Sequence, residues 1–292
     1  MSMISFPYAI FTETPDFPVH LQYGFHDEEL YLHAHEDFSE LVIVLNGSAA
    51  HVVGGESYYV SKGDVFVVGQ NTEHGYQQTK RLTICNIMFR QGVFDNAYDI
   101  RQLPGFQALF VLEPHYSQKY HFLSHLKLYE QTFSEVEALI TAVMQEYQNK
   151  KTGWQTITYA GFLELCVMLS RCYQNTDSGN AFLKLADAAA YLEHHFCEDV
   201  SMPELAELSG YSERQFFRVF KSVFQTTPNA YITDLRIKKA QQLLQNTSSS
   251  IGEIAYQCGY DDQNYFSRIF RKYMGMNPVN YRHIRKANLS VS

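Results

Sequence analysis

Two stretches near the C-terminal end of this 292-residue chain carry polar side chains of the types that bond to DNA bases. Each stretch interleaves them with large apolar residues, so we expect the apolar side chains to face a core and the polar ones to face outward. Arginine pairs with guanine, asparagine and glutamine with adenine, and serine with either. The same arginines also suit phosphate, because half or more of protein–DNA hydrogen bonds go to the backbone. The outward set is Arg214, Gln215 and Arg218, then Gln263, Asn264, Ser267 and Arg268.

A pair of helices must position each stretch. Pro203 suits the first turn of a helix, and Gly210 suits its end. Ser212 with Gln215 three residues later predicts a capping box at the start of the next helix. A helix, a glycine turn and a second helix form the helix-turn-helix pattern. The apolar face of the second helix holds Phe216, Phe217, Val219, Phe220 and Val223.

The same pattern recurs about 50 residues later, with one extra residue in the turn. A helix predicted from Pro228 to about Gln245 joins the two copies and is about 27 Å long. Successive major grooves on one face of DNA lie about 34 Å apart, so one chain can place two helices in adjacent grooves. The matching pairs are Leu205-Ala206 with Ile254-Ala255, Gly210-Tyr211 with Gly259-Tyr260, Phe216-x-Arg218-x-Phe220-Lys221 with Phe266-x-Arg268-x-Phe270-Arg271, and Pro228-x-x-Tyr231 with Pro278-x-x-Tyr281.

Charge is divided unevenly along a chain whose net charge is -8. Residues 181–292 hold 13 Lys and Arg against 11 Asp and Glu, whereas the remainder holds 10 against 20. An acidic N-terminal part would be repelled by phosphate, so only the C-terminal part suits DNA. The basic residues predicted as phosphate contacts or solvated charge are Lys221, Lys238, Lys239, Arg271, Lys272 and Arg282.

The region from Leu183 to Arg285 resembles the DNA-binding domain of the AraC/XylS family of transcription regulators. The resemblance implies that the positions of Arg214, Phe217, Arg218, Gln263, Asn264, Ser267 and Arg268 approach the bases. Phe217 replaces the family's usual polar residue, which favours contact with a thymine methyl group or simple packing. The matching residues are Ala206, Ser209-Gly210-Tyr211-Ser212, Phe216-x-Arg218-x-Phe220-Lys221, Pro228, Tyr231, Arg236, Ala240, Leu243-Leu244, Ile251-x-x-Ile254-Ala255, Gly259-Tyr260, Phe266-x-Arg268-x-Phe270-Arg271 and Pro278-x-x-Tyr281-Arg282.

The N-terminal part resembles the cupins through His33-x-His35-x-x-x-x-Glu40, Gly47, Gly63-Asp64 and His74. Cupin enzymes hold a divalent metal with three histidines and a glutamate, which leave positions open for substrate. The second motif departs from the family, with Gly69 and Asn71 where cupins have proline and a nearby glycine. We therefore expect a small-molecule pocket without a cofactor, or a hydrogen-bonded cluster, and keep a metal site as the alternative. The residues concerned in each case are His33, His35, Glu40 and His74.

A further resemblance, to sugar-responsive members of the family such as rhamnose regulators, implies a sugar effector. Tyr, His and Glu at the mouth of a barrel would suit one, since aromatic rings cover the apolar face of a sugar and polar groups take its hydroxyls. The residues that carry the resemblance are His35-x-x-Phe38-x-Glu40-Leu41-Val42-Ile43-Val44, Lys62-Gly63-Asp64-Val65-Phe66 and Cys85-Asn86-Ile87.

Short apolar runs between Leu41 and Gln78, separated by turn residues such as Asn46-Gly47, predict β-hairpins closed into a small cupin-like β-barrel. Amphipathic helices predicted over Ser134–Gln148 and Trp154–Tyr173 pack on that barrel or form a dimer interface. The polar stretch 174–180 indicates a linker. The fold class is thus α+β, with a ligand-sensing and dimerisation domain over 1–173 and an all-α DNA-binding domain over 181–292.

Composition agrees with a folded cytoplasmic protein: 46% of residues are hydrophobic, and neither a signal peptide nor a membrane-spanning run is visible. We predict a ligand-responsive regulator, not an enzyme, that controls sugar uptake or catabolism genes. Its expected partners are double-stranded promoter DNA, a small effector, RNA polymerase and a second copy of the chain. The alternatives are a metal-dependent cupin enzyme fused to a DNA-binding domain, and a ligand-independent regulator whose barrel only dimerises.

Overall fold

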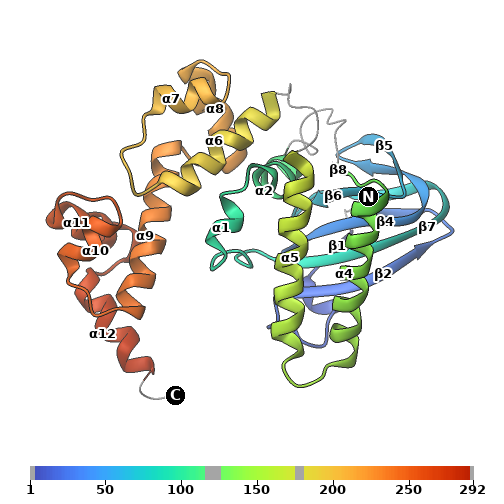
Figure 1. The fold of residues 1–292 in the computed structure, drawn as a ribbon, viewed down its shortest axis with the longest axis horizontal. Helices are drawn as coiled ribbons and strands as arrows, with labels where there is room; N and C mark the ends of the chain where they lie inside the picture. The colour runs from blue at the N-terminus through green and yellow to red at the C-terminus, as the bar shows by residue number, and fades with distance from the viewer. Residues whose placement is uncertain (1–3, 116–125, 175–180, 290–292) are drawn as a thin grey trace. The chain divides into compact units, whose positions relative to one another are not determined.

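The structure, a computed structural model, describes residues 4–115, 126–174 and 181–289. It contains two compact units, Met1–Asp187 and Ala188–Ser292, and the division falls inside helix α6 (Ala181–His195). Figure 1 shows a sheet with helices in the first unit and helices in the second, which confirms the α+β class. The predicted domain borders stay a prediction, because only Gln174 of the predicted linker 174–180 is described, as the last residue of α5 (Trp154–Gln174).

One eight-stranded sheet forms the body of the first unit. Its order is β1-β3-β7-β4-β6-β8, with β2 paired to β7 and β5 paired to β4. The two long strands β4 and β7 therefore connect all the others. The bounds are β1 (Ile4–Phe6), β2 (Val19–His26), β3 (Leu30–His35), β4 (Phe38–Val53), β5 (Glu56–Ser61), β6 (Asp64–Val68), β7 (His74–Arg90) and β8 (Leu126–Lys127).

Strand β4 takes part in both halves of the sheet. Its first half pairs with β6 and the end of β7, and its second half pairs with β5 and the start of β7. Register shifts between Val44 and Ala50 separate the two halves. Asn46-Gly47, predicted as a turn, is instead part of this irregular stretch. Gly47 has a φ of +73°, and a Cβ there would lie 2.1 Å from the carbonyl oxygen of Arg81 on β7, so only glycine fits.

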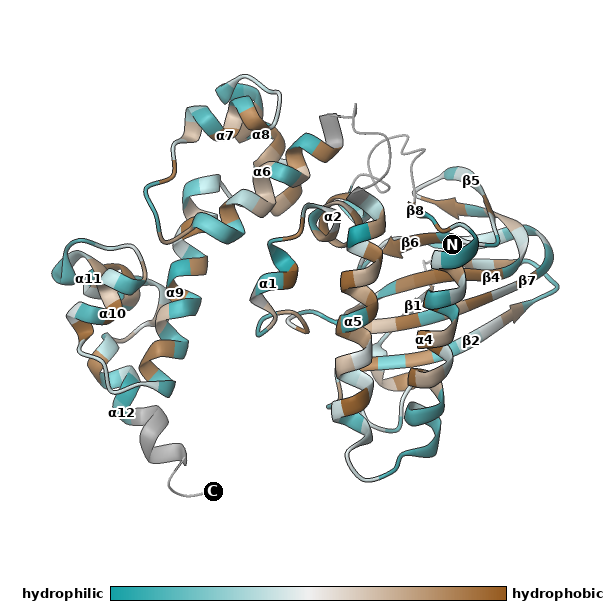
Figure 2. Cartoon of the chain, in the orientation of Figure 1, coloured by the Kyte–Doolittle hydropathy of each residue, from teal (hydrophilic) through white to brown (hydrophobic). Residues whose placement is uncertain are grey.

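The sheet is not closed, which corrects the predicted barrel. Among the described strands, no pairing joins β8 at one end of the order to β1 at the other. Helices α4 (Glu130–Asn149) and α5 (Trp154–Gln174) bury apolar surface in its place. Figure 2 shows brown, hydrophobic residues recurring along both helices and along the strands. The buried side chains of α4 are Phe133, Val136, Ile140, Val143, Met144 and Tyr147.

The apolar stripe of α4 therefore serves its own unit, which favours the packing interpretation over the dimer interface. The Tyr147 hydroxyl is hydrogen-bonded to His20 Nδ1 on β2, at 2.7 Å. Short helical segments complete the described part of this unit, and Gly105 in one of them approaches α5 so closely that a Cβ would lie 1.8 Å from the Ser170 carbonyl oxygen. These segments are η1 (Tyr8–Ile10), α1 (Tyr98–Arg101), α2 (Pro104–Phe106) and the π-helix η2 (Gln107–Leu112).

The second unit contains the predicted duplication. The two helix-turn-helix pairs are α7–α8 and α10–α11, and the 19-residue helix α9 joins them, about 28 Å long. Gly210 and Gly259 occupy the two turns with φ of +70° and +81°. The bounds are α7 (Met202–Leu208), α8 (Glu213–Phe224), α9 (Pro228–Asn246), α10 (Ile251–Gln257), α11 (Gln263–Met274) and α12 (Pro278–Leu289). In the part of the chain that the structure describes, no helix has the length and apolar composition needed to cross a membrane.

Candidate nucleic-acid interface and N-terminal cavity

Helix α8 presents the first predicted DNA-contacting set. Its buried face is Phe216, Phe220 and Val223. The capping box is confirmed: the Gln215 side-chain oxygen accepts from the Ser212 N–H at 3.2 Å and from its hydroxyl at 2.8 Å. This oxygen is therefore engaged inside the protein. Of the remaining predicted residues, Phe217 is half-buried, and the exposed ones are Arg214, Arg218 and Lys221.

Helix α11 presents the second set from the equivalent place in the repeat. Its N-cap is Asp262, whose carboxylate accepts the backbone N–H of Tyr265 at 2.6 Å. The guanidinium of Arg268 stands over the Tyr265 ring, 5.2 Å from its centroid. Ser267 is half-buried, and the exposed predicted residues are Gln263, Asn264, Arg268 and Arg271.

Arg236 on α9 connects the segment after α6 with the turn of the second helix pair, a role that the sequence did not predict. Its guanidinium donates to the carbonyl oxygens of Phe196, Glu198 and Gly259, at 2.5, 2.8 and 2.8 Å. Gly259 lies in the second turn, whereas the other two follow α6. The family resemblance included this arginine, but its position in the sequence alone indicated none of these three hydrogen bonds.

Three cations predicted at phosphate lie against protein groups. Lys239 Nζ is 3.2 Å from Cys197 Sγ, Lys238 Nζ is 3.3 Å from Asp234 Oδ2, and Arg282 donates to the Ser249 carbonyl oxygen at 2.5 Å. By contrast, Lys221 is exposed on α8, and Arg271 and Lys272 are exposed on α11. Among the side chains whose burial the structure describes, every exposed lysine and arginine of the second unit thus lies on α8 or α11.

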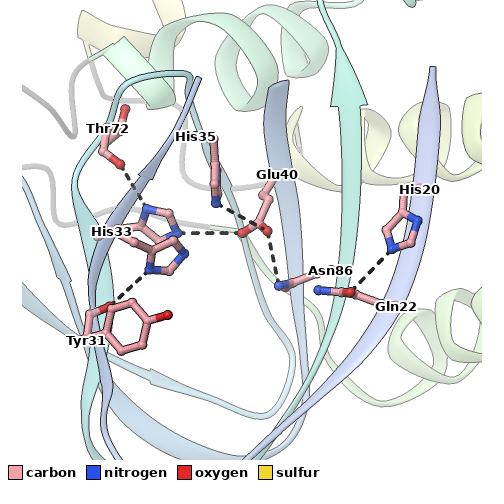
Figure 3. Close-up of polar contacts among 9 residues, drawn as sticks. His20, Gln22, Tyr31, His33, His35, Glu40, Thr72 and Asn86 are labelled. Carbon is pink, nitrogen blue, oxygen red and sulfur yellow. Dashed lines mark hydrogen bonds and ion pairs between the residues drawn. The ribbon is translucent and has the colours of Figure 1, made fainter. Parts of the chain in front are cut away.

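The first unit brings together all four residues predicted for its site. His33 and His35 lie on β3, Glu40 on β4 and His74 on β7, where it pairs with His33. Candidate ligand atoms of the three histidines lie within 4.8 Å of one another. Glu40 Oε1 is 3.7 Å from His35 Nε2, and Glu40 Oε2 is 3.7 Å from His74 Nε2. Figure 3 shows His35 turned toward this carboxylate.

Burial dominates the electrostatics of this cluster. It lowers the pKa of His33, and it lowers that of His35 to about 4, so both are neutral at pH 7. Burial also raises the pKa of Glu40, but the interactions with His74 and His35 outweigh it, and the net pKa is lowered. The site is therefore an ionised carboxylate beside the neutral imidazoles of His33 and His35.

The cluster fits a divalent metal ion. His33 Nδ1 and His74 Nδ1 lie 3.1 and 3.0 Å from the carbonyl oxygens of Tyr31 and Thr72, which leaves each Nε2 lone pair for a ligand. Both ring nitrogens of His35 are buried without a hydrogen-bond partner. Neutral imidazoles and one carboxylate are ligands that zinc and related ions prefer.

A cavity of about 230 Å³ opens beside the cluster. His33 and Glu40 line it, whereas His35 and His74 do not. Asn86 was not among the predicted site residues, yet its amide donates to Glu40 Oε1 at 3.4 Å. Strand alternation could have indicated this face, because it includes every second residue of β2 and β7. The other lining residues are Phe6, Ile10, Phe11, Gln22, Gly24, His26, Leu30, Tyr31 and Met88.

Comparison with known proteins matches both units. Residues 205–284 match a family described as a helix-turn-helix domain, and residues 20–146 match one described as an AraC-like ligand binding domain. The chain is 32% identical to the HTH-type transcriptional activator RhaS of Enterobacter sp. (strain 638), over 87% of this chain and 88% of that one. It is 31% identical to RhaS of Escherichia fergusonii, with the same coverage. Among solved structures, the DNA-binding domain of AdpA in complex with a target DNA is 30% identical, covering 36% of this chain and 95% of that chain, with a TM-score of 0.35.

Proposed function

This chain belongs to the AraC family of DNA-binding transcriptional regulators, and from that membership we propose that it activates promoters in response to a sugar held in the N-terminal cavity. The observation that carries the proposal is the pair of exposed polar faces, on α8 and α11, at the two ends of one continuous helix. Each face has arginine or amide side chains that suit base edges or phosphate. The proposed DNA contacts are Arg214, Gln215, Phe217, Arg218, Lys221, Gln263, Asn264, Ser267, Arg268 and Arg271.

Each cavity wall suits part of a sugar. Phe6, Phe11 and Met88 supply apolar surface, on which the C–H face of a sugar ring packs. Glu40 and Asn86 supply an acceptor and an amide for its hydroxyls. The curated relatives are named transcriptional activators, which supports activation and disfavours the cupin-enzyme alternative.

If a metal is bound, His33, His35, Glu40 and His74 would hold it. The ion would then supply a Lewis acid to which hydroxyl groups of the effector bind directly. The chain's own residues orient the effector: Asn86 restrains the carboxylate of Glu40, and the backbone carbonyls of β3 and the β6–β7 connection restrain the imidazoles.

The effector acts by binding one state of the regulator more tightly than another, since only a difference in affinity shifts a population. We propose that the liganded state, as a homodimer in the cytoplasm, binds promoter DNA and contacts RNA polymerase. The genes it controls would then serve uptake or catabolism of the same sugar.

Two measurements on the full chain test the proposal. Selection from random duplex pools should return a site with two short blocks about one helical turn apart. A thermal-shift screen of mono- and disaccharides should then raise the unfolding temperature with at least one sugar. Binding without sequence preference would contradict DNA recognition, whereas the lack of any thermal shift would contradict only the sugar assignment.

A further inference from the structure

The helices α8 and α11 differ at equivalent positions of the repeat. Ser212, Gln215 and Arg218 of α8 correspond to Asp262, Tyr265 and Arg268 of α11. In α8 the residue three places after the N-cap turns back onto it, because the Gln215 oxygen accepts from Ser212. In α11 the cap needs no such partner, since the Asp262 carboxylate itself accepts the N–H at the third position. The side chain of Tyr265 is thereby free for another contact.

Tyr265 instead lies between the core and Arg268. Its ring is 47% exposed and stands 6.1 Å from the ring of Tyr260, which is 7% exposed. On its other side the guanidinium of Arg268 lies 5.2 Å from the Tyr265 ring. Arg268 itself is exposed on the surface of α11.

Tyr260, the inner of the two tyrosines, is held in place by Arg236. The Arg236 guanidinium lies 5.2 Å from the Tyr260 ring and donates to three backbone carbonyl groups. Arg236, Tyr260, Tyr265 and Arg268 thus form a continuous row of cation–ring and ring–ring contacts that leads from the interior of the unit to the surface of α11, with the two rings tilted by 53° to each other. Among the described residues, the guanidinium of Arg218 on α8 lies over no aromatic ring.

We infer that Tyr265 is a positioning residue that holds Arg268 for a paired hydrogen bond with the O6 and N7 atoms of one guanine. The inference deepens the proposed function and rests on it. A guanidinium is a planar fork, and restraining its plane lowers the entropy lost when it pairs with a base edge. Arg218 lacks this restraint and suits a phosphate contact, for which orientation matters less. The second helix pair therefore supplies the guanine discrimination.

The test measures binding of the full-length protein to its selected site and to versions with each base pair changed. Arg268→Ala should relax the preference at one guanine by about tenfold. Tyr265→Leu should relax it at the same base pair by about threefold, because a ring that stabilises a cation is lost. Tyr265→Phe keeps the ring and should keep the preference. The variant with both Tyr265→Leu and Arg268→Ala should lose no more at that base pair than Arg268→Ala alone.

Tyr256→Ala is the matched control, because this tyrosine is 77% exposed on α10 and takes no part in the row of contacts from Arg236 to Arg268. It should leave every base preference unchanged. Thermal unfolding of each variant shows whether the unit remains folded, and Tyr265→Phe against Tyr265→Leu isolates the ring if larger changes unfold it.

Several outcomes would overturn the inference. Additive losses in the double variant would show that Tyr265 acts independently of Arg268. If Arg268→Ala weakened binding to all sequences equally and lowered the salt dependence by about one ion, Arg268 would contact phosphate. In both cases the wild type still selects a site, so the proposed function is not contradicted. A wild type without any base preference would contradict both the inference about Tyr265 and the proposed function.

Discussion

Glu40 is the residue on which the polar contacts of the N-terminal cavity converge. Its two oxygens face His35 and His74, and Asn86 donates to one of them. A buried carboxylate needs such partners, because an unpaired buried charge costs several kcal/mol. The arrangement suits a cation or the hydroxyl groups of a ligand.

We expect the purified protein to retain about one equivalent of zinc or nickel after metal loading and dialysis. His35→Ala and His74→Ala should each remove most of it, because each takes away one candidate ligand. His26→Asn is the control, since His26 lines the cavity outside the cluster. Metal content by elemental analysis is the measurement. Equal retention by the wild type and both alanine variants would show that the cluster binds no ion.

His20 should make stability depend on pH. Burial lowers the pKa of His20 from 6.5. Among the charged groups near His20, Glu40 raises this pKa and Lys150 lowers it. The hydrogen-bond partner of His20 on α4 is Tyr147. Because the unfolded chain binds a proton more readily, stability is full above about pH 6.5 and declines as the pH falls toward the folded pKa. Urea unfolding between pH 8 and 5.5 should show a smaller decline for His20→Asn than for the wild type. Parallel curves for the two proteins would rule out this contribution.

At the scale of elements, the glycine turns explain how closely the helices of the second unit approach. Gly259 has a φ of +81°, and a Cβ there would lie 2.3 Å from the carbonyl oxygen of Cys197. Gly275 ends α11 with a similar φ of +72°, but nothing lies within 4 Å of a Cβ built there. The two positions therefore separate the cost of backbone conformation from the cost of collision.

Gly275→Ala should destabilise the protein by about 1 kcal/mol, the ordinary cost of a left-handed conformation. Gly259→Ala should cost on the order of 3 kcal/mol or more, because a backbone group must also move. Chemical unfolding monitored by circular dichroism measures both. Similar losses for the two variants would mean that the contact between Gly259 and Cys197 is easily relaxed.

At the scale of the whole molecule, α9 sets the distance between α8 and α11, the two helices proposed to contact DNA. Tyr281 of α12 accepts hydrogen bonds from Gln241 and Gln245 of α9, at 3.0 and 2.9 Å. Tyr231 at the equivalent position of the first copy donates to Glu193 of α6. Together with the hydrogen bonds of Arg236, these contacts hold α9 against α6, α12 and the turn of the second helix pair.

Changing the spacing of the DNA blocks should therefore abolish specific binding. Insertion of five base pairs places the second block on the opposite face of the duplex, and insertion of ten places it a full turn too far. We expect both to reduce affinity to the nonspecific level, measured by fluorescence anisotropy with replacement of one block as the control. Restored binding with ten base pairs would indicate that separate chains, not one α9, bridge the blocks.

The sequence by itself determined the duplicated helix pairs, the length of α9 and the four residues of the cluster. Helix caps, glycine turns and apolar periodicity act over a few residues, so Ser212, Gly210 and the 50-residue repeat carry enough information to predict them. The family resemblance extended this to the function of both units, and the comparisons confirmed it.

Only the tertiary structure decided the closure of the sheet, the continuous path of β4 and the contacts of Arg236 and Tyr265. Gly47 suits a turn or a bulge equally, and the approach of Arg81 on β7 makes the choice. The partners of Arg236 lie 23 to 40 residues away in the chain. Local propensity carries no signal for such pairings, because packing between distant segments fixes them.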